Sequence, residues 1–193
     1  MFGAIKHNLA NLFNFSGQDS RSTFWWYFLF LFILWVIVNV VIVAPIVAAA
    51  VGTAMEGAQS GADQAAVEAQ MEADVLANMT SLALSGLVVA LVFALLLAAS
   101  LVRRARDAGK PGWWGAVPVI LRLGAAVIGY FIIQSVMGSI DSASAPDMDA
   151  LMEVEMPGAI FVDIAGWLGL ILAIVIGVLP SSGIAGATVE TFE

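Results

Sequence analysis

The sequence predicts an all-α integral membrane protein built as a bundle of four membrane-spanning helices. Three observations predict this fold class. Hydrophobic residues make up 61% of the chain and charged residues only 11%, against about 45–50% and about 25% in ordinary globular proteins. The apolar residues gather in four long runs, and most basic residues lie between the second and third runs. A water-soluble chain of 193 residues could not hide this much apolar surface, so lipid must solvate part of it.

The chain begins with a short segment of mixed polarity, residues 1–23. Apolar side chains recur there at helical spacing, which predicts a short amphipathic helix lying on the membrane surface; they are Ile5, Leu9, Leu12 and Phe13. Residues 14–22 are expected to form a turn that leads into the first span.

Each of the four apolar runs is long enough to cross the hydrocarbon core, which takes about 20 helical residues. We expect a membrane domain over residues 24–180, with spans at about 24–51, 79–102, 115–138 and 158–179. The first run is too long for the apolar region of a signal peptide. Pro45 should kink the first helix or end its regular part. Residues 181–193 are predicted to be a loose tail.

The basic residues predict which way the chain crosses the membrane. Two connections, residues 52–78 and 139–157, carry acids but no Lys or Arg, whereas residues 103–110 hold four of the seven basic residues. Lys and Arg near span ends mark the cytoplasmic side. We therefore expect residues 103–114 and both termini in the cytoplasm and the acidic connections outside.

The acidic connections carry weaker signals. Residues 52–78 are rich in alanine and should be partly helical. In residues 139–157, methionines recur at helical spacing, which favours a helix lying at the membrane interface over a thioether site for Cu(I); they are Met148, Met152 and Met156. We predict no metal site and no cofactor, and the chain has no cysteine.

The two halves of the chain resemble each other, as a two-plus-two pseudo-repeat would. Each half has a tryptophan pair, a span, an acidic connection and a second span. The second and fourth spans also carry small residues four apart, which are Gly86, Ala90, Ala94 and Ala98, and Ala165, Gly169, Ala173 and Gly177. Small residues let helices approach closely in lipid. We expect these two spans to form the central packing contact, although a chance stripe in an Ala-rich chain is the alternative.

The strongest candidate site is the stretch RRARDAGKPGWW, residues 103–114. Its basic residues, joined by Arg21, are Arg103, Arg104, Arg106 and Lys110. One interpretation is a topology signal with general attraction to anionic headgroups. The other is a defined anion site, in which Asp107 and Asp19 each hold an arginine through paired hydrogen bonds. Gly109 and Gly112 are counted with these two aspartates as positioning residues.

Two tryptophan pairs stand where spans enter the predicted cytoplasmic leaflet: Trp25 with Trp26, and Trp113 with Trp114. Tryptophan favours that depth because its ring is apolar and its N–H seeks a partner. The pairs are either general membrane anchors or the two flanks of one pocket on that side.

Two ionisable residues, Arg122 and Asp163, fall inside predicted spans. Such residues are functional candidates because a charge in lipid is costly. They differ in depth by about 10 Å, at 1.5 Å per residue, so a direct ion pair requires shifted span boundaries. Arg122 could instead extend its guanidinium toward the cytoplasmic surface. Asn39 and Gln134 are expected to hydrogen-bond between helices.

The motif at residues 103–114 resembles the signature R-R-L-H-D-x-G-K/R-S-G-W-W of the domain of unknown function 805 family. The matching residues are Arg103, Arg104, Asp107, Gly109, Lys110, Gly112, Trp113 and Trp114. A second motif of that family precedes its first span, and here it is matched by Phe13, Phe15, Gly17, Arg21, Phe24, Trp25 and Trp26. The resemblance covers residues 11–180 and implies a small helical protein of the bacterial inner membrane. It implies no activity.

The chain departs from the family pattern at four positions. Arg106 replaces a histidine, Pro111 a serine, Gln18 an arginine and Thr23 a glutamate. The usual glycine-rich ending of the family is not recognisable after residue 180. Loss of the histidine and serine weakens any proton-transfer role borrowed from the family.

Three functions follow from these observations as hypotheses. The first is a non-enzymatic membrane component that binds anionic lipid headgroups, or a partner protein, at its basic and tryptophan-rich face. The second is a small oligomeric transporter or channel subunit that uses Arg122 and Asp163. The third, a lipid-modifying enzyme, is weakest because no convincing nucleophile or base is in sight. His7 is the only histidine, and the few basic residues lie at the bilayer, so nucleic acid is not an expected partner.

Overall fold

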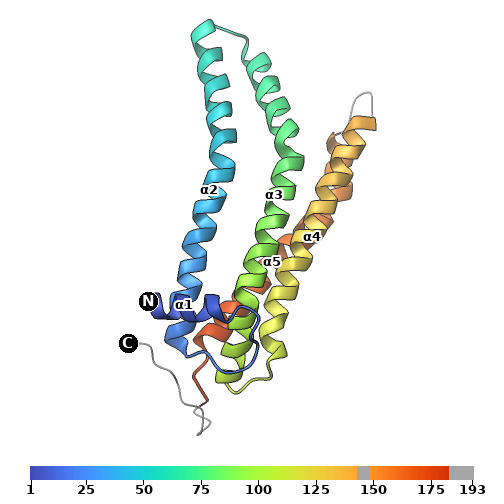
Figure 1. The fold of residues 1–193 in the computed structure, drawn as a ribbon. Helices are drawn as coiled ribbons and strands as arrows, with labels where there is room; N and C mark the ends of the chain where they lie inside the picture. Colours follow the sequence, from blue (N-terminus) through green and yellow to red (C-terminus); the bar gives the residue numbers. More distant parts are fainter. Residues whose placement is uncertain (143–147, 183–193) are drawn as a thin grey trace.

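The structure is a computed structural model, and it describes residues 1–142 and 148–182. Regular structure in these residues is entirely helical (Figure 1). The helices are α1 (Phe2–Ala10), α2 (Arg21–Ser60), α3 (Gln64–Asp107), α4 (Trp113–Ser142) and α5 (Met148–Val178). α2, α3, α4 and α5 are long and apolar enough to cross a membrane. The predicted all-α fold with four spans is therefore confirmed.

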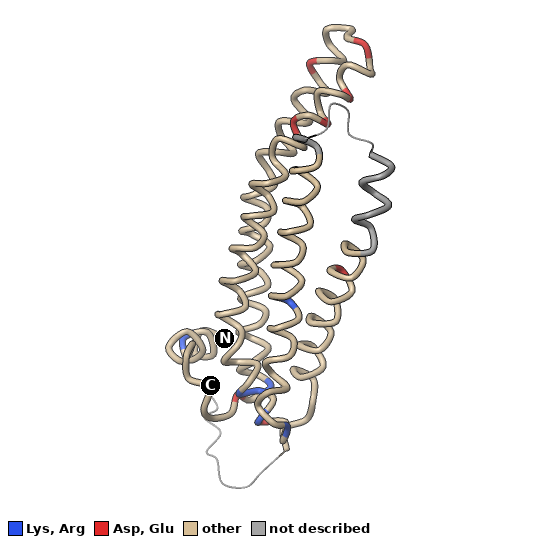
Figure 2. Tube along the Cα trace, turned by 90° about the vertical axis from the view of Figure 1, so that its right-hand side faces the viewer, with Lys and Arg blue, Asp and Glu red and all other residues tan. Residues whose placement is uncertain are grey.

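The four long helices run alternately up and down, and α1 lies across one end of them (Figure 1). Basic residues gather at this end, and acidic residues gather at the tip of the α2–α3 hairpin (Figure 2). We call the first the basic end, formed by Arg21, Arg103, Arg104, Arg106 and Lys110. The second is the acidic end, formed by Glu56, Asp63, Glu68, Glu72 and Asp74. Which end faces the cytoplasm stays a prediction.

The acidic connection of residues 52–78 is almost entirely helical, more so than expected. α2 runs through Pro45 to Ser60, and α3 begins at Gln64. Gly61 ends α2 in the left-handed conformation at φ 64°, and the Asp63 carboxylate caps α3 by accepting the Ala65 N–H. Alanine favours helix regardless of polarity, so both helices continue after the apolar run stops. The 40 residues of α2 span about 60 Å, twice a hydrocarbon core of about 30 Å.

The other boundaries agree better with the sequence. α1 forms where a short helix was predicted, and its position on a membrane surface stays a prediction. The turn after it ends at Ser20, whose hydroxyl caps α2 by accepting the Thr23 N–H. The fourth apolar segment that could cross a membrane, Gly158–Val178, lies within α5. α5 itself begins earlier, at Met148, so the expected interfacial helix is continuous with the span. The side chains of residues 140–157, including the methionines and acids of that connection, lie outside the described residues.

The expected central contact between the second and fourth spans is wrong. α4 packs extensively against both α3 and α5, and the contact between α3 and α5 is much smaller. The α5 stripe is a packing face, but a Cβ at Gly169 would meet the Pro118 carbonyl oxygen on α4 at 3.0 Å. At Gly177 it would meet a ring carbon of Phe24 on α2 at 2.6 Å. On α3, a Cβ at Gly86 would meet nothing within 4 Å. The spacing therefore predicted where the small residues lie but not which helix packs against them.

The core lies at the basic end, where α2, α3 and α5 converge. Its buried cluster comprises Phe24, Leu101, Ala105, Ala173 and Ile176. Two longer side chains tie α2 to its neighbours there. The Trp25 indole N–H donates to the Gly177 carbonyl at 3.2 Å, and the buried Tyr27 hydroxyl donates to the Leu96 carbonyl at 2.8 Å. This convergence fixes the frame in which the charged residues of the basic end are held.

Candidate functional site

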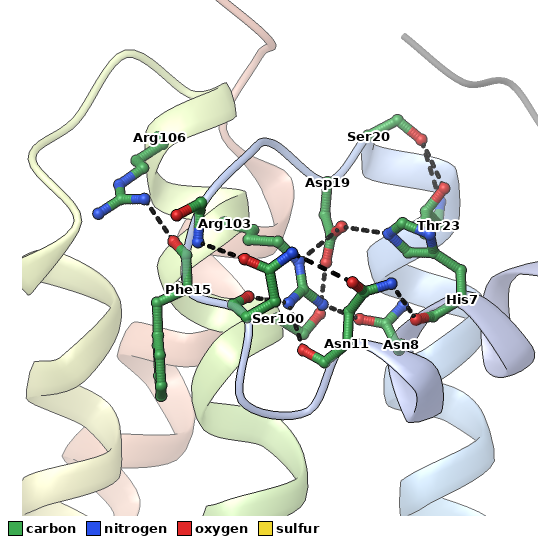
Figure 3. Close-up of polar contacts among 12 residues, drawn as sticks. His7, Asn8, Asn11, Phe15, Asp19, Ser20, Thr23, Ser100, Arg103 and Arg106 are labelled. Carbon is green, nitrogen blue, oxygen red and sulfur yellow. Dashed lines mark hydrogen bonds and ion pairs between the residues drawn. The ribbon is translucent and has the colours of Figure 1, made fainter.

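Arg103 lies inside the protein and not on its surface (Figure 3). Its side chain is buried with 3% exposed. The guanidinium Nε donates to the Asp19 carboxylate at 3.0 Å, and the remaining nitrogens donate to three partners in the N-terminal segment. These are the Asn8 amide oxygen at 2.6 Å and the backbone carbonyls of Asn11 at 2.9 Å and Asn14 at 2.6 Å. Arg103 therefore fastens residues 8–19 to α3.

Asp19 completes this network as the partner of Arg103. Its carboxylate is fully buried and pairs with Arg103, whereas Arg21 is exposed. The other carboxylate oxygen accepts the Ser100 hydroxyl at 3.1 Å. The imidazole Nε2 of His7 lies 3.4 Å from the Asp19 carboxylate, so α1 joins the same cluster. Buried charges are tolerated when they are paired and hydrogen-bonded in this way.

Arg104 and Asp107 form a second buried cluster that holds the end of α5. The Arg104 guanidinium donates to the Asp107 carboxylate, as the sequence predicted, and to the carbonyls of Gly177 and Leu179. The last carbonyls of a helix lack partners within it, and a cation there is favourable. Asp107 in turn accepts the Ser181 hydroxyl at 2.6 Å, and its own carbonyl accepts the Ser182 N–H at 2.8 Å. The segment after α5 is thereby pinned to α3.

Replacing Arg104 by leucine should loosen this segment. The last carbonyls of α5 lose their donor, and the Asp107 carboxylate loses its cation. We expect faster hydrogen exchange at residues 177–182, by about tenfold or more, because each lost charged hydrogen bond is worth about 1.5–3 kcal/mol. Exchange measured by mass spectrometry in detergent checks this result. Equal exchange in the variant and the unchanged protein would contradict the proposed anchoring.

The remaining cations of the basic end are exposed. Arg21 and Lys110 project outward, and the Arg106 side chain is exposed while donating to the Phe15 carbonyl. The Lys110 ammonium lies 5.6 Å from the centroid of the Trp114 ring, which is a cation–π distance. The predicted basic site is thus divided. Arg103 and Arg104 are internal, and Arg21, Arg106 and Lys110 form what we call the exposed basic face.

Gly109 and Gly112 shape the turn between α3 and α4. Gly109 adopts φ 70°, where a side chain would be strained. A Cβ at Gly112 would lie 2.9 Å from the Arg106 guanidinium Nε, so glycine lets this side chain cross the turn. Gly112 therefore leaves room for Arg106 in the exposed basic face, and the role of both glycines in positioning an anion site stays a prediction.

The tryptophans divide in a similar way. Trp25 is half-buried and turned toward α5 by its hydrogen bond to Gly177. Trp26, Trp113 and Trp114 are exposed, by 41%, 63% and 39%. Exposed rings at the end of an apolar span suit the membrane interface. The structure thus separates one packing tryptophan from three that face outward.

Arg122 and Asp163 both line a cavity of about 580 Å³ between the four long helices. Its walls are otherwise mostly apolar, with Phe28, Phe93 and Trp167 among them. Within the described part of the chain, Arg122 and Asp163 form no ion pair. Asn39 also lines the cavity, but its amide donates to the Trp35 carbonyl of its own helix, so the expected bond between helices is absent there. Gln134 is half-buried.

Sequence reasoning missed the partners of the two buried arginines. Asn8 shows 1% exposure and Ser100 also 1%, and neither residue type signals burial by itself. Asn8 repeats at helical spacing with Ala4 on the protein-facing side of α1, and this was the available signal. The other partners are backbone carbonyls, which every residue has, so a sequence cannot single them out. They belong to Asn11, Asn14, Gly177 and Leu179.

Comparison with known proteins places the chain in one family. No curated protein matches it, and no solved structure does. Residues 12–185 match the family described as "Protein of unknown function (DUF805)". These residues include both motifs, the ion pairs of Arg103 with Asp19 and of Arg104 with Asp107, and all four apolar helices. Since the match covers well over half of the sequence, the chain belongs to the DUF805 family.

Proposed function

We propose that the protein is a non-enzymatic membrane component whose exposed basic face binds the headgroups of anionic lipids. One observation carries the proposal: the basic cluster is divided, with Arg103 and Arg104 internal, Arg106 and Lys110 exposed, and Lys110 lying over the Trp114 ring. The internal pair holds the scaffold through buried bonds, so it is not free to bind. Arg106 and Lys110 do not hold the core together, and they lie at the end of an apolar helix.

The chemistry of the exposed basic face suits a phosphate group at a membrane surface. Lysine and arginine donate charged hydrogen bonds to phosphate oxygens, and each contributes about 1 kcal/mol near an anionic surface. The Trp113 and Trp114 rings would lie at headgroup depth. A partner protein with an acidic surface is the competing occupant, and the experiment below separates the two.

We further propose the orientation and location of this face. Lys and Arg gather at one end of the bundle and are absent from the acidic end. By the positive-inside rule the basic end faces the cytoplasm, and the family resemblance suggests the inner membrane of a bacterium. The anionic lipids of that leaflet would then be the natural ligands.

Replacing Arg106 and Lys110 together by glutamine should weaken retention of anionic lipid. We expect the number of phosphatidylglycerol molecules that remain on the protein, measured by native mass spectrometry, to fall about fivefold or more, because two surface charges contribute about 2 kcal/mol. Lys6→Gln on α1 removes an exposed charge that is not part of the exposed basic face and should have a smaller effect. Unchanged retention in the double variant would sink the headgroup proposal and favour a partner protein.

Transport is a second candidate, and the intramembrane cavity favours it. A transporter needs a polar site within the bilayer, and ionisable residues there mark such sites. Arg122 and Asp163 both reach the same cavity. If the protein is an oligomeric transporter or channel subunit, vesicles containing it should show a solute flux that Arg122→Gln abolishes. A monomer without flux would exclude this candidate.

A further inference from the structure

The cavity has one side through which a membrane-dissolved molecule could enter. α2 packs on α3, α3 on α4 and α4 on α5. α2 meets α5 at the basic end, where Phe24 and Trp25 lie against Gly177. From that point α5 leans away from α2 toward the acidic end (Figure 1 and Figure 2). Among the described residues, α2 packs less against α5 than the other neighbouring long helices do against each other, so this side is the least closed.

Two opposite charges stand one helical turn apart inside this cavity. A Cβ at Gly166 would lie 3.1 Å from a terminal guanidinium nitrogen of Arg122, so the Arg122 side chain reaches from α4 across to α5. Asp163 is three residues before Gly166 on α5, which is about 4.5 Å along the helix axis. Both side chains are exposed to the cavity. Neither has a hydrogen-bond or ion-pair partner among the described residues.

We propose that this cavity binds the zwitterionic headgroup of a phosphoethanolamine lipid, which enters between α2 and α5. The lipid phosphate pairs with the Arg122 guanidinium, and its ammonium group pairs with the Asp163 carboxylate. The apolar walls contributed by Phe28, Phe93 and Trp167 take the upper part of the acyl chains. The inference does not rest on headgroup binding at the exposed basic face. It gives the transport candidate its ligand class.

Charge complementarity selects this occupant over others. A lipid with a purely anionic head would meet the Asp163 carboxylate next to Arg122, and like charges disfavour binding. A free amino acid carries the same two charges but offers nothing to the apolar walls. A headgroup that carries an anion and an ammonium a few bonds apart satisfies both side chains at once, which offsets the cost of two charges in the membrane.

The test measures which lipids stay bound. The full chain is reconstituted in nanodiscs that contain equal amounts of phosphatidylethanolamine and phosphatidylglycerol with identical acyl chains. Retained lipids are counted by native mass spectrometry. We expect one phosphatidylethanolamine to be retained in preference, and both Arg122→Gln and Asp163→Asn to reduce this preference about tenfold, the value of one charged hydrogen bond. The double variant leaves no lone charge in the membrane, so it tests the site even if a single variant fails to fold.

Matched controls separate this site from the exposed basic face. Lys6→Gln and Glu72→Gln make comparable charge changes outside both the cavity and the exposed basic face and should leave retention of phosphatidylethanolamine unchanged. Loss of phosphatidylglycerol alone on Lys110→Gln would concern the exposed basic face. The cavity proposal is overturned if wild-type protein retains both lipids equally or if the cavity variants leave the preference unchanged. The proposal is also overturned if free glycerophosphoethanolamine competes with the same affinity as phosphatidylethanolamine, because the ligand would then be a soluble zwitterion.

Discussion

Replacing Arg103 by leucine is expected to destabilise the protein by about 3–5 kcal/mol, because the change leaves the buried Asp19 carboxylate without its cation. The variant also removes the donor from Asn8 and from the carbonyls of Asn11 and Asn14. All of these acceptors lie in the segment that leads into α2. We expect a lower midpoint of thermal unfolding in detergent, measured by circular dichroism. We also expect residues 8–19 to lose their protection against hydrogen exchange early.

Two further variants show whether the buried pair carries this effect. Arg106→Leu removes an exposed arginine three residues away and should cost less than about 1 kcal/mol, as surface charges usually do. The double variant Arg103→Leu with Asp19→Leu removes both charges. Since replacing both partners of a buried ion pair is often close to neutral, the double variant should be more stable than Arg103→Leu alone. If all three variants unfold at the same temperature, the network of Figure 3 does not support the fold.

Replacing Gly115 by alanine should also be severe, although it adds a single methyl group. A Cβ at Gly115 would lie 2.4 Å from the Leu101 carbonyl oxygen and 2.5 Å from the Val102 nitrogen. Both atoms belong to the α3 backbone, which cannot rotate away as a side chain could. α3 and α4 would have to move apart at the basic end, where the buried arginines are held. Overpacking of this kind costs about 1–3 kcal/mol and occasionally more.

Gly124 provides the matched control on the same helix. A Cβ at Gly124 would meet nothing within 4 Å, and alanine is the better helix former by about 1 kcal/mol. Gly124→Ala should therefore leave the unfolding temperature unchanged or raise it slightly. Parallel thermal unfolding of the two variants checks the close contact of α3 and α4. Similar behaviour of both would show that the two backbones are not so close at Gly115.

The candidate site shows how much of the arrangement of charged residues can be predicted from a sequence. The motif RRARDAGKPGWW showed that the basic residues cluster and that Asp107 would hold an arginine. The ion pair of Arg104 with Asp107 follows from their spacing of about one helical turn. The motif could not show that Arg103 points inward. The Asn8 amide that binds Arg103 is 95 residues away in the sequence, and the other partners are backbone carbonyls. Only the folded chain brings these acceptors together.

Composition and spacing along the chain were enough to predict four helices that could cross a membrane. Four apolar runs of sufficient length require four spanning helices, because backbone groups in lipid must be satisfied within a helix. The two motifs were enough to define the family. Both are local properties, which depend on residue type and on spacing along one helix.

Which helices touch, and which charges are available, depended on the packing of the whole fold. The small residues of α5 fit against α4 and α2, because close packing depends on the surface offered by the partner helix. Burial divides the five residues of the basic end into two that hold the fold and three that face outward. The same packing places Arg122 and Asp163 in one cavity, although they lie on different helices. Contact between distant segments arises from the tertiary structure, and no pattern along the chain contains it.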